Sequence, residues 1–360
     1  MNKQLFLLIT AGGVMGVLAV TLAVLGNPAN MGYCIACFLR DITGGIGLHR
    51  AAPVQYIRPE IIGLVLGAFV ASLATREFRA TGGSSAFTRF TLGFVAMIGM
   101  LVFLGCPLRA ILRLSGGDLN AVVGLLGLVA GVVIGISFLK NGFSLGRGIP
   151  QQRGNGYLLP ALMAALLILL LAKPAFLFFS TAGPGSMQAP LLISLGAGLV
   201  VGILAQRSRI CLVGGIRDLI FFRDGQLLYG FAAIFVAALL GNLAVSAFNI
   251  GFADQPVAHT DGIWNFLGMT LAGWALVLLG GCPLRQLVAG AEGNTDSAVT
   301  IMGLMAGAAT AHNFGLAASP AGVPVAGQIA VLVSLLAVFI IAMINRPAAV
   351  TGGVGVGKGS

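Results

Sequence analysis

The sequence predicts an all-α polytopic membrane protein with about ten transmembrane or half-membrane helices in two inverted five-helix repeats. Three observations predict this class. Hydrophobic residues make up 58% of the 360 residues and charged residues only 8%, too few charges to keep the surface of a soluble domain of this size hydrated. Apolar segments long enough to enter lipid recur along the chain. Two cysteine motifs also occur twice, at nearly the same separation.

The apolar segments define the expected helices. The first begins near residue 5 and is too long for the apolar region of a signal peptide, so we interpret it as a transmembrane helix. The candidate spans are 5–25, 61–75, 90–105, 121–139, 157–179, 189–206, 227–248, 263–280, 298–316 and 326–344. Small residues four apart predict close helix packing, and they are Gly63/Gly67, Gly127/Gly131/Gly135, Gly198/Gly202 and Gly303/Gly307.

The repeated motifs divide the chain. The first places an Arg-Asp pair six residues after a cysteine, as Cys34, Arg40 and Asp41 and again as Cys211, Arg217 and Asp218. The second, Gly-Cys-Pro-Leu-Arg, occupies 105–109 and 281–285. Cys34 and Cys211 are 177 residues apart, and Cys106 and Cys282 are 176 apart, which indicates a duplication. We expect a first repeat over 1–180, including a polar loop at 140–156, a second over 181–345, and a disordered glycine-rich tail at 346–360.

The distribution of basic residues predicts the orientation of the repeats. Five crossings per half would insert the second copy upside down, with both termini on the same side. With cytoplasmic termini, 14 of the 20 lysines and arginines fall inside and 5 outside, as the positive-inside rule requires. The net charge of +10 therefore follows from topology, and we expect no nucleic-acid partner. The expected location is the bacterial inner (plasma) membrane, with the lipid bilayer as a partner.

The duplicated cysteines are the main candidates for function. Inverted repeats place substrate sites where broken helices meet near the membrane midplane, and Gly-Cys-Pro is suited to such a break. Helix–cysteine loop–helix motifs would then bring four thiols toward a common axis. A single membrane cysteine is more often a small apolar filler, but filler does not account for duplicated motifs. The candidate translocation residues are Cys34, Cys106, Cys211 and Cys282.

Charged residues of the same motifs are secondary candidates. Arg109 and Arg285 follow the motif cysteines by three residues, and arginine donors suit oxyanions. Arg40, like Arg109, is expected on the outer side, where arginine is disfavoured, and this suggests a role there. For Asp41 and Asp218, each beside an arginine, a structural ion pair or helix cap is favoured over proton handling. The secondary candidates are Cys37, Arg40, Asp41, Arg217 and Asp218.

The remaining reactive side chains form no metal or cofactor motif. Cys34 and Cys37 form a C-x-x-C pair that suits thiol redox chemistry, but Gly214 stands where a duplicate of Cys37 would lie. The histidines have no metal-ligand spacing, and His312 is expected to be a packed, hydrogen-bonded residue. We therefore expect no metal, no cofactor and no catalytic residue.

The motifs give the chain a family resemblance. The stretch from Asn30 to Asp41, both Gly-Cys-Pro-Leu-Arg motifs, and Arg209-Ile-Cys211 with Arg217-Asp218 resemble the YeeE/YedE sulfur-compound transporters, in particular the YedE-like branch associated with selenium transport. The resemblance implies uptake of a thiosulfate-like or selenium-containing anion along a relay of Cys34, Cys106, Cys211 and Cys282. It also implies a small cytosolic sulfurtransferase-like partner.

Two other functions compete with transport. A membrane thiol-disulfide oxidoreductase would use Cys34 and Cys37, although such an enzyme usually needs a second cysteine pair. A purely structural membrane subunit leaves the duplicated motifs without a cause. Transport of a selenium- or sulfur-containing small anion, without enzymatic catalysis, is therefore the favoured function.

Overall fold

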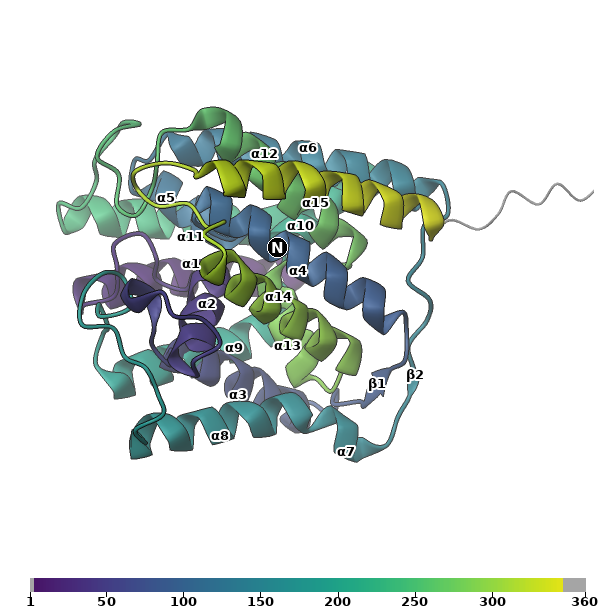
Figure 1. Cartoon of the computed structure of the whole chain (residues 1–360). Helices are drawn as coiled ribbons and strands as arrows, with labels where there is room; N and C mark the ends of the chain where they lie inside the picture. The colour runs from purple at the N-terminus through teal and green to yellow at the C-terminus, as the bar shows by residue number, and fades with distance from the viewer. Residues whose placement is uncertain (1–2, 346–360) are drawn as a thin grey trace, which may run out of the picture.

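A computed structural model describes residues 3–345, and this part of the chain is mostly helical (Figure 1). The expected tail at 346–360 lies outside the described residues. The long helices are α1 (Lys3–Val24), α3 (Pro59–Ala74), α4 (Ala86–Phe103), α6 (Asn120–Lys140), α8 (Leu158–Ala172), α9 (Leu191–Ser208), α11 (Gln226–Ala244), α12 (Gly262–Leu278), α14 (Thr295–Asn313) and α15 (Val325–Ile344).

The expected spans are confirmed as helices, with two qualifications of length and polarity. Within residues 3–345, eight helical stretches are long and apolar enough to cross a membrane, so this is a multi-pass membrane protein. The expected segments 157–179 and 298–316 are not among them. α8 has only 15 residues, and α14 carries Asp296 and His312, which lower its hydropathy. Three of the eight stretches run through a break into a second, shorter helix.

A short helix follows each of the four cysteine loops that the sequence predicted. These helices are α2 (Ile35–Gly45), α5 (Pro107–Ser115), α10 (Leu212–Phe222) and α13 (Pro283–Ala291). Each begins immediately after a motif cysteine, which occupies the N-cap position. In α5 and α13 proline is the first helical residue, where its missing N–H has no helical partner to lose and its fixed φ suits the helix. The expected break at Gly-Cys-Pro is confirmed, since α4 ends before Leu104, which has a φ of 62°.

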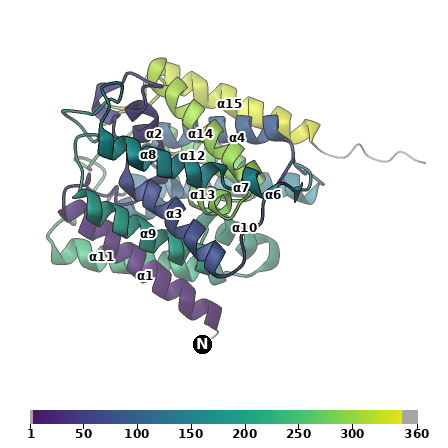
Figure 2. The same ribbon diagram turned by 90° about the horizontal axis from the view of Figure 1, so that it is seen from below.

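Helices of the two halves pack against each other in reciprocal pairs. The most extensive contacts are α1 with α11, α3 with α9, α4 with α14, and α6 with α12. Figure 2 shows the first two of these pairs running side by side. If the halves are superimposed by sequence, α1 corresponds to α9, α3 to α11, α4 to α12 and α6 to α14. The α3–α9 pair is therefore the α1–α11 pair with the two halves exchanged. The α6–α12 pair is related to the α4–α14 pair in the same way. The opposite insertion of the halves stays a prediction.

Glycine rows explain how these pairs approach so closely. A methyl group at Gly127 or Gly131 of α6 would meet the carbonyl oxygens of Phe266 and Thr270 of α12. The corresponding Gly303 and Gly307 of α14 face the carbonyls of Phe90 and Phe94 of α4 in the same way. Small residues let backbones come together where apolar lipid offers helices little incentive to associate. The predicted close packing at the glycine rows is confirmed.

Two peripheral features complete the fold. α8 and α15 lie at opposite edges of the bundle in Figure 1. The segment 140–156, expected as a loop, contains a two-residue strand β2 (Ile149–Pro150) and the single turn α7 (Arg153–Gly156). β2 pairs antiparallel with β1 (Thr81–Gly82). The sequence did not predict this pairing, because two-residue strands carry no alternating pattern.

Candidate functional site

The duplicated cysteines cap the helices that they precede. Cys34 Sγ accepts a hydrogen bond from the backbone N–H of Cys37, with 3.3 Å between the atoms. Cys211 Sγ accepts the equivalent bond from Gly214, also at 3.3 Å. Gly214 occupies the position of Cys37, so the cap needs only a backbone N–H there. Each thiol satisfies one of the orphan donors at a helix N-terminus.

Three cysteines form one group, which we call the Cys34 group (Cys34, Cys37 and Cys106). The Sγ atoms of Cys34 and Cys37 lie 2.6 Å apart. The thiol of Cys106 is in hydrogen-bonding contact with the thiol of Cys34 and with the backbone N–H groups of Ala36 and Arg109. All three side chains are buried. The break between α4 and α5 thus places Cys106 against the start of α2.

The other two form the Cys211 group (Cys211 and Cys282). Cys211 Sγ accepts a hydrogen bond from the backbone N–H of Cys282 at 3.3 Å, and the two thiols are also in contact. Cys282 receives the N–H of Arg285, just as Cys106 receives that of Arg109. The two groups therefore share one pattern, with Cys37 as the additional member in the first half.

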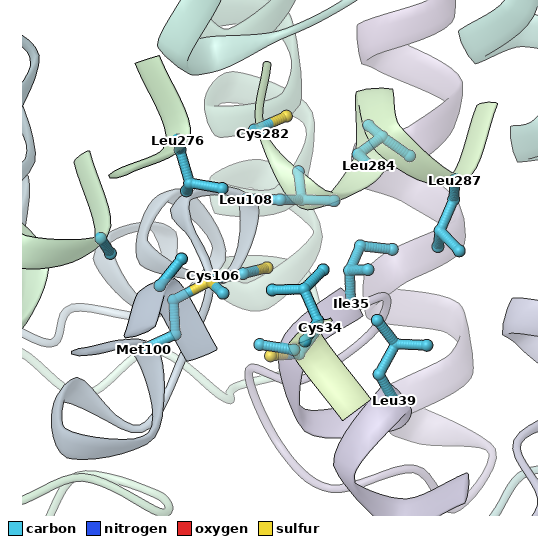
Figure 3. Packing of buried hydrophobic residues seen from close by; sticks show 14 of the residues in the cluster. Cys34, Ile35, Leu39, Met100, Cys106, Leu108, Leu276, Cys282, Leu284 and Leu287 are labelled. Atoms are coloured by element: carbon cyan, nitrogen blue, oxygen red, sulfur yellow. The ribbon is translucent and has the colours of Figure 1, made fainter. Parts of the chain in front are cut away.

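An apolar layer separates the two groups. Figure 3 shows Cys282 on one side, Cys34 and Cys106 on the other, and Leu108 and Leu276 between them. All five of these side chains are buried in one continuous hydrophobic cluster. The structure therefore brings the predicted cysteines together as two groups, and not as one evenly spaced line.

The cysteine groups lie in positive backbone potential. α2 and α5 begin at the Cys34 group, and α10 and α13 begin at the Cys211 group. A helix N-terminus carries roughly half a positive charge, and its N–H groups favour anions. This potential comes from backbone and needs no charged side chain inside the apolar cluster. The arrangement suits a small anion that contacts the thiols.

Arg109 is committed to the protein backbone around the Cys34 group. Its guanidinium donates to the carbonyl oxygen of Leu104 and, at 3.3 Å, to that of Val257. Nη1 also lies 3.7 Å from Cys37 Sγ. The side chain is fully buried. Arg109 therefore pins the break after α4 beside the thiols, and its charge acts on the site from a fixed place.

Arg285 is neutralised by a carboxylate that the sequence analysis missed. Its Nη2 lies 3.0 Å from Oε2 of Glu292. Arg209, two residues before Cys211, contacts Glu292 at 3.1 Å and Glu77 at 2.7 Å. We call these four residues the Glu292 network. Glu77 and Glu292 are 215 positions apart in the sequence and carry no motif, so only the folded chain brings them together.

The predicted Arg-Asp ion pairs are confirmed in both halves. Arg40 Nη2 lies 2.7 Å from Asp41 Oδ1, and Arg217 Nη2 lies 2.7 Å from Asp218 Oδ1. The first pair is buried and Asp41 also binds Arg58 at 2.7 Å. The second pair is partly exposed, at 31% and 23% of the two side chains. The same motif is thus a buried three-member cluster in one half and a partly exposed pair in the other.

Most arginines expected on the disfavoured side have internal partners. Arg58 donates to Asp41 and to the carbonyls of Pro184 and Met187. Arg113 pairs with Asp118 at 2.6 Å and lies over the ring of Phe103. Both are fully buried. Both side chains are therefore held by bonds within the protein.

His312 differs from its expected role. Its ring packs against His49, with 4.7 Å between the centroids, so the prediction of packing is confirmed. Its Nε2 is buried without a hydrogen-bond partner within residues 3–345, so the prediction that it is hydrogen-bonded is wrong. The sequence held no signal for this, because the environment of α14 is set by α2 and by loops far along the chain.

The molecule is thus a multi-pass helical membrane protein with two buried groups of cysteines, the Cys34 group and the Cys211 group, at helix N-termini. Residues 207–353 match a family model described as sulphur transport. This match includes Cys211 and Cys282 but not the Cys34 group. The chain is therefore similar to sulphur-transport proteins over part of its length.

Two curated relatives are similar over shorter stretches. The chain is 33% identical over 85 residues to the thiosulfate transporter TsuA of Spirochaeta thermophila, covering 24% of this chain and 25% of that protein. It is 26% identical over 120 residues to the thiosulfate transporter TsuA of Escherichia coli, covering 33% of each. The matched stretches span a quarter to a third of these relatives.

Proposed function

We propose that this protein moves a selenium- or sulfur-containing small anion, such as thiosulfate or selenite, across the membrane. The proposed pathway passes Cys34 and Cys106, then Cys282 and Cys211. The observation that carries the proposal is that all four thiols are buried at the N-termini of short helices. The names of the relatives support sulfur-compound transport, and selenium is our finer proposal.

Thiols suit such a pathway because they bind weakly and reversibly. A thiol is a weak donor with a polarizable sulfur, and the helix N-termini add attraction for negative charge. No covalent bond to the substrate forms, so no oxidant, reductant or leaving group is required. Conduction needs binding strong enough for entry and weak enough for release. Two separate thiol groups would supply two such sites in sequence.

The apolar layer gives the pathway a barrier. Leu108 and Leu276 are buried between the groups, and an anion crossing them would leave polar contacts. Transport therefore requires these side chains to move. With the predicted inverted topology, the Cys34 group belongs to the external half of the path and the Cys211 group to the cytoplasmic half. A cytosolic sulfurtransferase-like partner would then receive the anion beyond the Cys211 group.

Arg109 and Arg285 are proposed to act at a distance. Arg109 holds its charge beside Cys37 through backbone bonds, which attracts an anion toward the Cys34 group. Arg285 is balanced by Glu292, so its attraction is moderated on the side where release is proposed. The asymmetry favours capture at the first group and release at the second.

The decisive experiment is uptake of radiolabelled thiosulfate and selenite into proteoliposomes. We expect Cys106→Ala and Cys282→Ala each to lower uptake strongly. Cys37→Ala is the matched control, because Gly214 stands at the equivalent position in the second half. It should retain most uptake. Wild-type rates in both the Cys106 and Cys282 variants would refute the thiol pathway, and the ratio of the two substrates decides between sulfur and selenium.

One observation favours a second function. The Cys34 and Cys37 sulfurs are 2.6 Å apart, close enough for a thiol-disulfide oxidoreductase to use them. The oxidoreductase function requires Cys37, so Cys37→Ala would abolish thiol-disulfide exchange. Mass-spectrometric mapping of thiol state during turnover gives an independent test. A cycling Cys34–Cys37 disulfide supports the enzyme, whereas permanently reduced thiols support transport.

A further inference from the structure

A cavity of about 350 Å³ lies between α2, α14 and nearby loops, and we call it the Arg40 cavity. Its lining includes Arg40 of α2, His312 of α14, Leu104 and Val257. α2 and α14 lie side by side in both views (Figures 1 and 2). Its volume is at the small end of the range for ligand sites, so it has room for a small ion with water.

Arg40 lines this cavity with a guanidinium whose hydrogen-bond donors are only partly satisfied. Its Nε and Nη2 both donate to Asp41 Oδ1, at 3.0 and 2.7 Å. Nη1 has no hydrogen-bond partner within the described chain. Asp41 is shared with Arg58, so two guanidinium groups face one carboxylate. The cluster retains a positive charge, and one of its donors remains available at the cavity.

His312 brings a second unpartnered polar group to the same cavity. Its Nε2 has no accessible surface and makes no hydrogen bond to residues 3–345, so a ligand in the cavity can reach only the other ring nitrogen, Nδ1. His49 holds the ring in place. His49 Nδ1 accepts from the N–H of Ala51 at 3.3 Å, so its Nε2 donates to the carbonyl of Arg40 at 3.0 Å. This fixes the surface against which His312 packs.

The Arg40 cavity is joined to the thiols by Arg109. Leu104 and Val257 line the cavity, and their carbonyl oxygens accept hydrogen bonds from Arg109. The same guanidinium reaches Cys37 Sγ at 3.7 Å. Arg40 also follows Cys37 by three residues on α2, so their side chains lie one helical turn apart on the same face. The cavity is therefore next to the Cys34 group along α2.

We propose that the Arg40 cavity is a binding site for the oxygen atoms of a small oxyanion, with Arg40 Nη1 and His312 as its donors. This rests on the proposed function and adds a capture site ahead of the Cys34 group. The cavity recognises oxygens through donors with N–H groups, whereas the thiols recognise the softer atom. An oxyanion without a terminal sulfur, such as sulfate, should therefore bind the cavity as well.

The helix pair that the duplication relates to α2 and α14, namely α10 and α6, lacks this site. Ile136 stands where the duplication places the counterpart of His312, and Arg217 is 31% exposed instead of buried against a cavity. The donors therefore occur on one side of the molecule only. A capture site is needed only where the substrate enters, so this asymmetry agrees with a fixed direction of loading.

The test measures binding to the purified full-length protein in lipid nanodiscs by calorimetry, with sodium sulfate and sodium thiosulfate as probes. His312→Ile places the corresponding first-half residue at this position. We expect it to weaken binding of both anions at least about fivefold, because one hydrogen bond is lost. Arg40→Gln should do the same. Arg50→Gln is the control, since Arg50 is exposed, stacks on Phe178 and does not line the cavity.

Each outcome decides the proposal. Weaker sulfate binding in His312→Ile with unchanged binding in Arg50→Gln supports it. Unchanged binding in His312→Ile overturns it, and so does an equal loss in Arg50→Gln, because the effect would then be one of general charge. The binding assay does not depend on transport. Wild-type protein that binds sulfate but takes up no labelled anion would refute the proposed function and retain the site.

Discussion

Cys211 Sγ and the backbone N–H of Cys282 are joined by a 3.3 Å hydrogen bond. The bond links the N-termini of α10 and α13, which approach from segments about 70 residues apart in the sequence. The same sulfur accepts the N–H of Gly214. One thiol therefore caps its own helix and positions its neighbour, so its structural and transport roles have to be separated by substitution.

Cys211→Ser separates the two roles. A hydroxyl oxygen can accept both N–H groups, so the thermal stability in detergent should stay near that of the wild type. Uptake of labelled thiosulfate should still fall strongly, because oxygen is smaller and less polarizable than sulfur. Cys211→Ala should lose the cap as well, at a cost of about 1 kcal/mol. A serine variant with normal uptake would show that a soft donor is not needed.

Glu292→Gln should slow release of the anion. The substitution removes the carboxylate that balances Arg285 and Arg209, which leaves positive charge beside the Cys211 group. Initial uptake rates should show a lower KM together with a lower maximal rate. Adding Arg285→Gln to Glu292→Gln should restore both values toward those of the wild type. A higher KM in the single variant would contradict the moderating role of Glu292.

Gly202→Ala should destabilise the α3–α9 pair. Its new methyl group would meet the carbonyl of Leu64 and lie 2.8 Å from the nitrogen of Ala68, so the helices would have to separate. Gly196→Ala on the same helix is the control, because nothing lies within 4 Å of its methyl position. The first should lower the melting temperature in detergent, and the second should leave it equal or slightly higher, since alanine favours helix by up to about 1 kcal/mol. Equal melting temperatures would argue against tight packing at Gly202.

Asp41→Asn should be far more damaging than Asp218→Asn. Asp41 balances Arg40 and Arg58 inside the protein, and loss of one partner from a buried ion pair costs about 3–5 kcal/mol. Asp218 and Arg217 are partly exposed, where a pair contributes less than about 1 kcal/mol. Thermal denaturation of the two variants measures the difference. Similar losses of stability in the two variants would contradict a larger electrostatic contribution from Asp41 than from Asp218.

The fold was largely predictable because apolar length and glycine spacing act locally. The apolar run that forms α6 predicts a membrane helix. Gly127 and Gly131 predict a closely packed neighbouring helix but do not identify it. The short helices were harder. α2 has only 11 residues, with Arg40 and Asp41 in its middle, so its pattern resembles a polar loop. Its helical state depends on burial among other helices, which no local pattern encodes.

The candidate site was predictable only where the duplication marked it. The repeat identifies Cys34, Cys106, Cys211 and Cys282, and the structure brings them together in two groups. The acceptors of Arg109 are backbone carbonyls, which every residue possesses, so the sequence cannot single them out. Glu292 and His312 lack counterparts in the repeat. Their roles depend on contacts between distant segments, which only folding creates.

The reciprocal pairing of helices bears on how this protein is made. α1 finds its main partner in α11, and α3 finds its own in α9, so a nascent first half enters the membrane without the surfaces it needs. The helices of the first half must remain in the lipid without their main partners until the second half has been synthesised and inserted. A chain that stops halfway would present unmatched glycine rows to quality-control proteases. Conversely, the two halves synthesised as separate polypeptides in one cell should assemble into a working whole, as complementary fragments do.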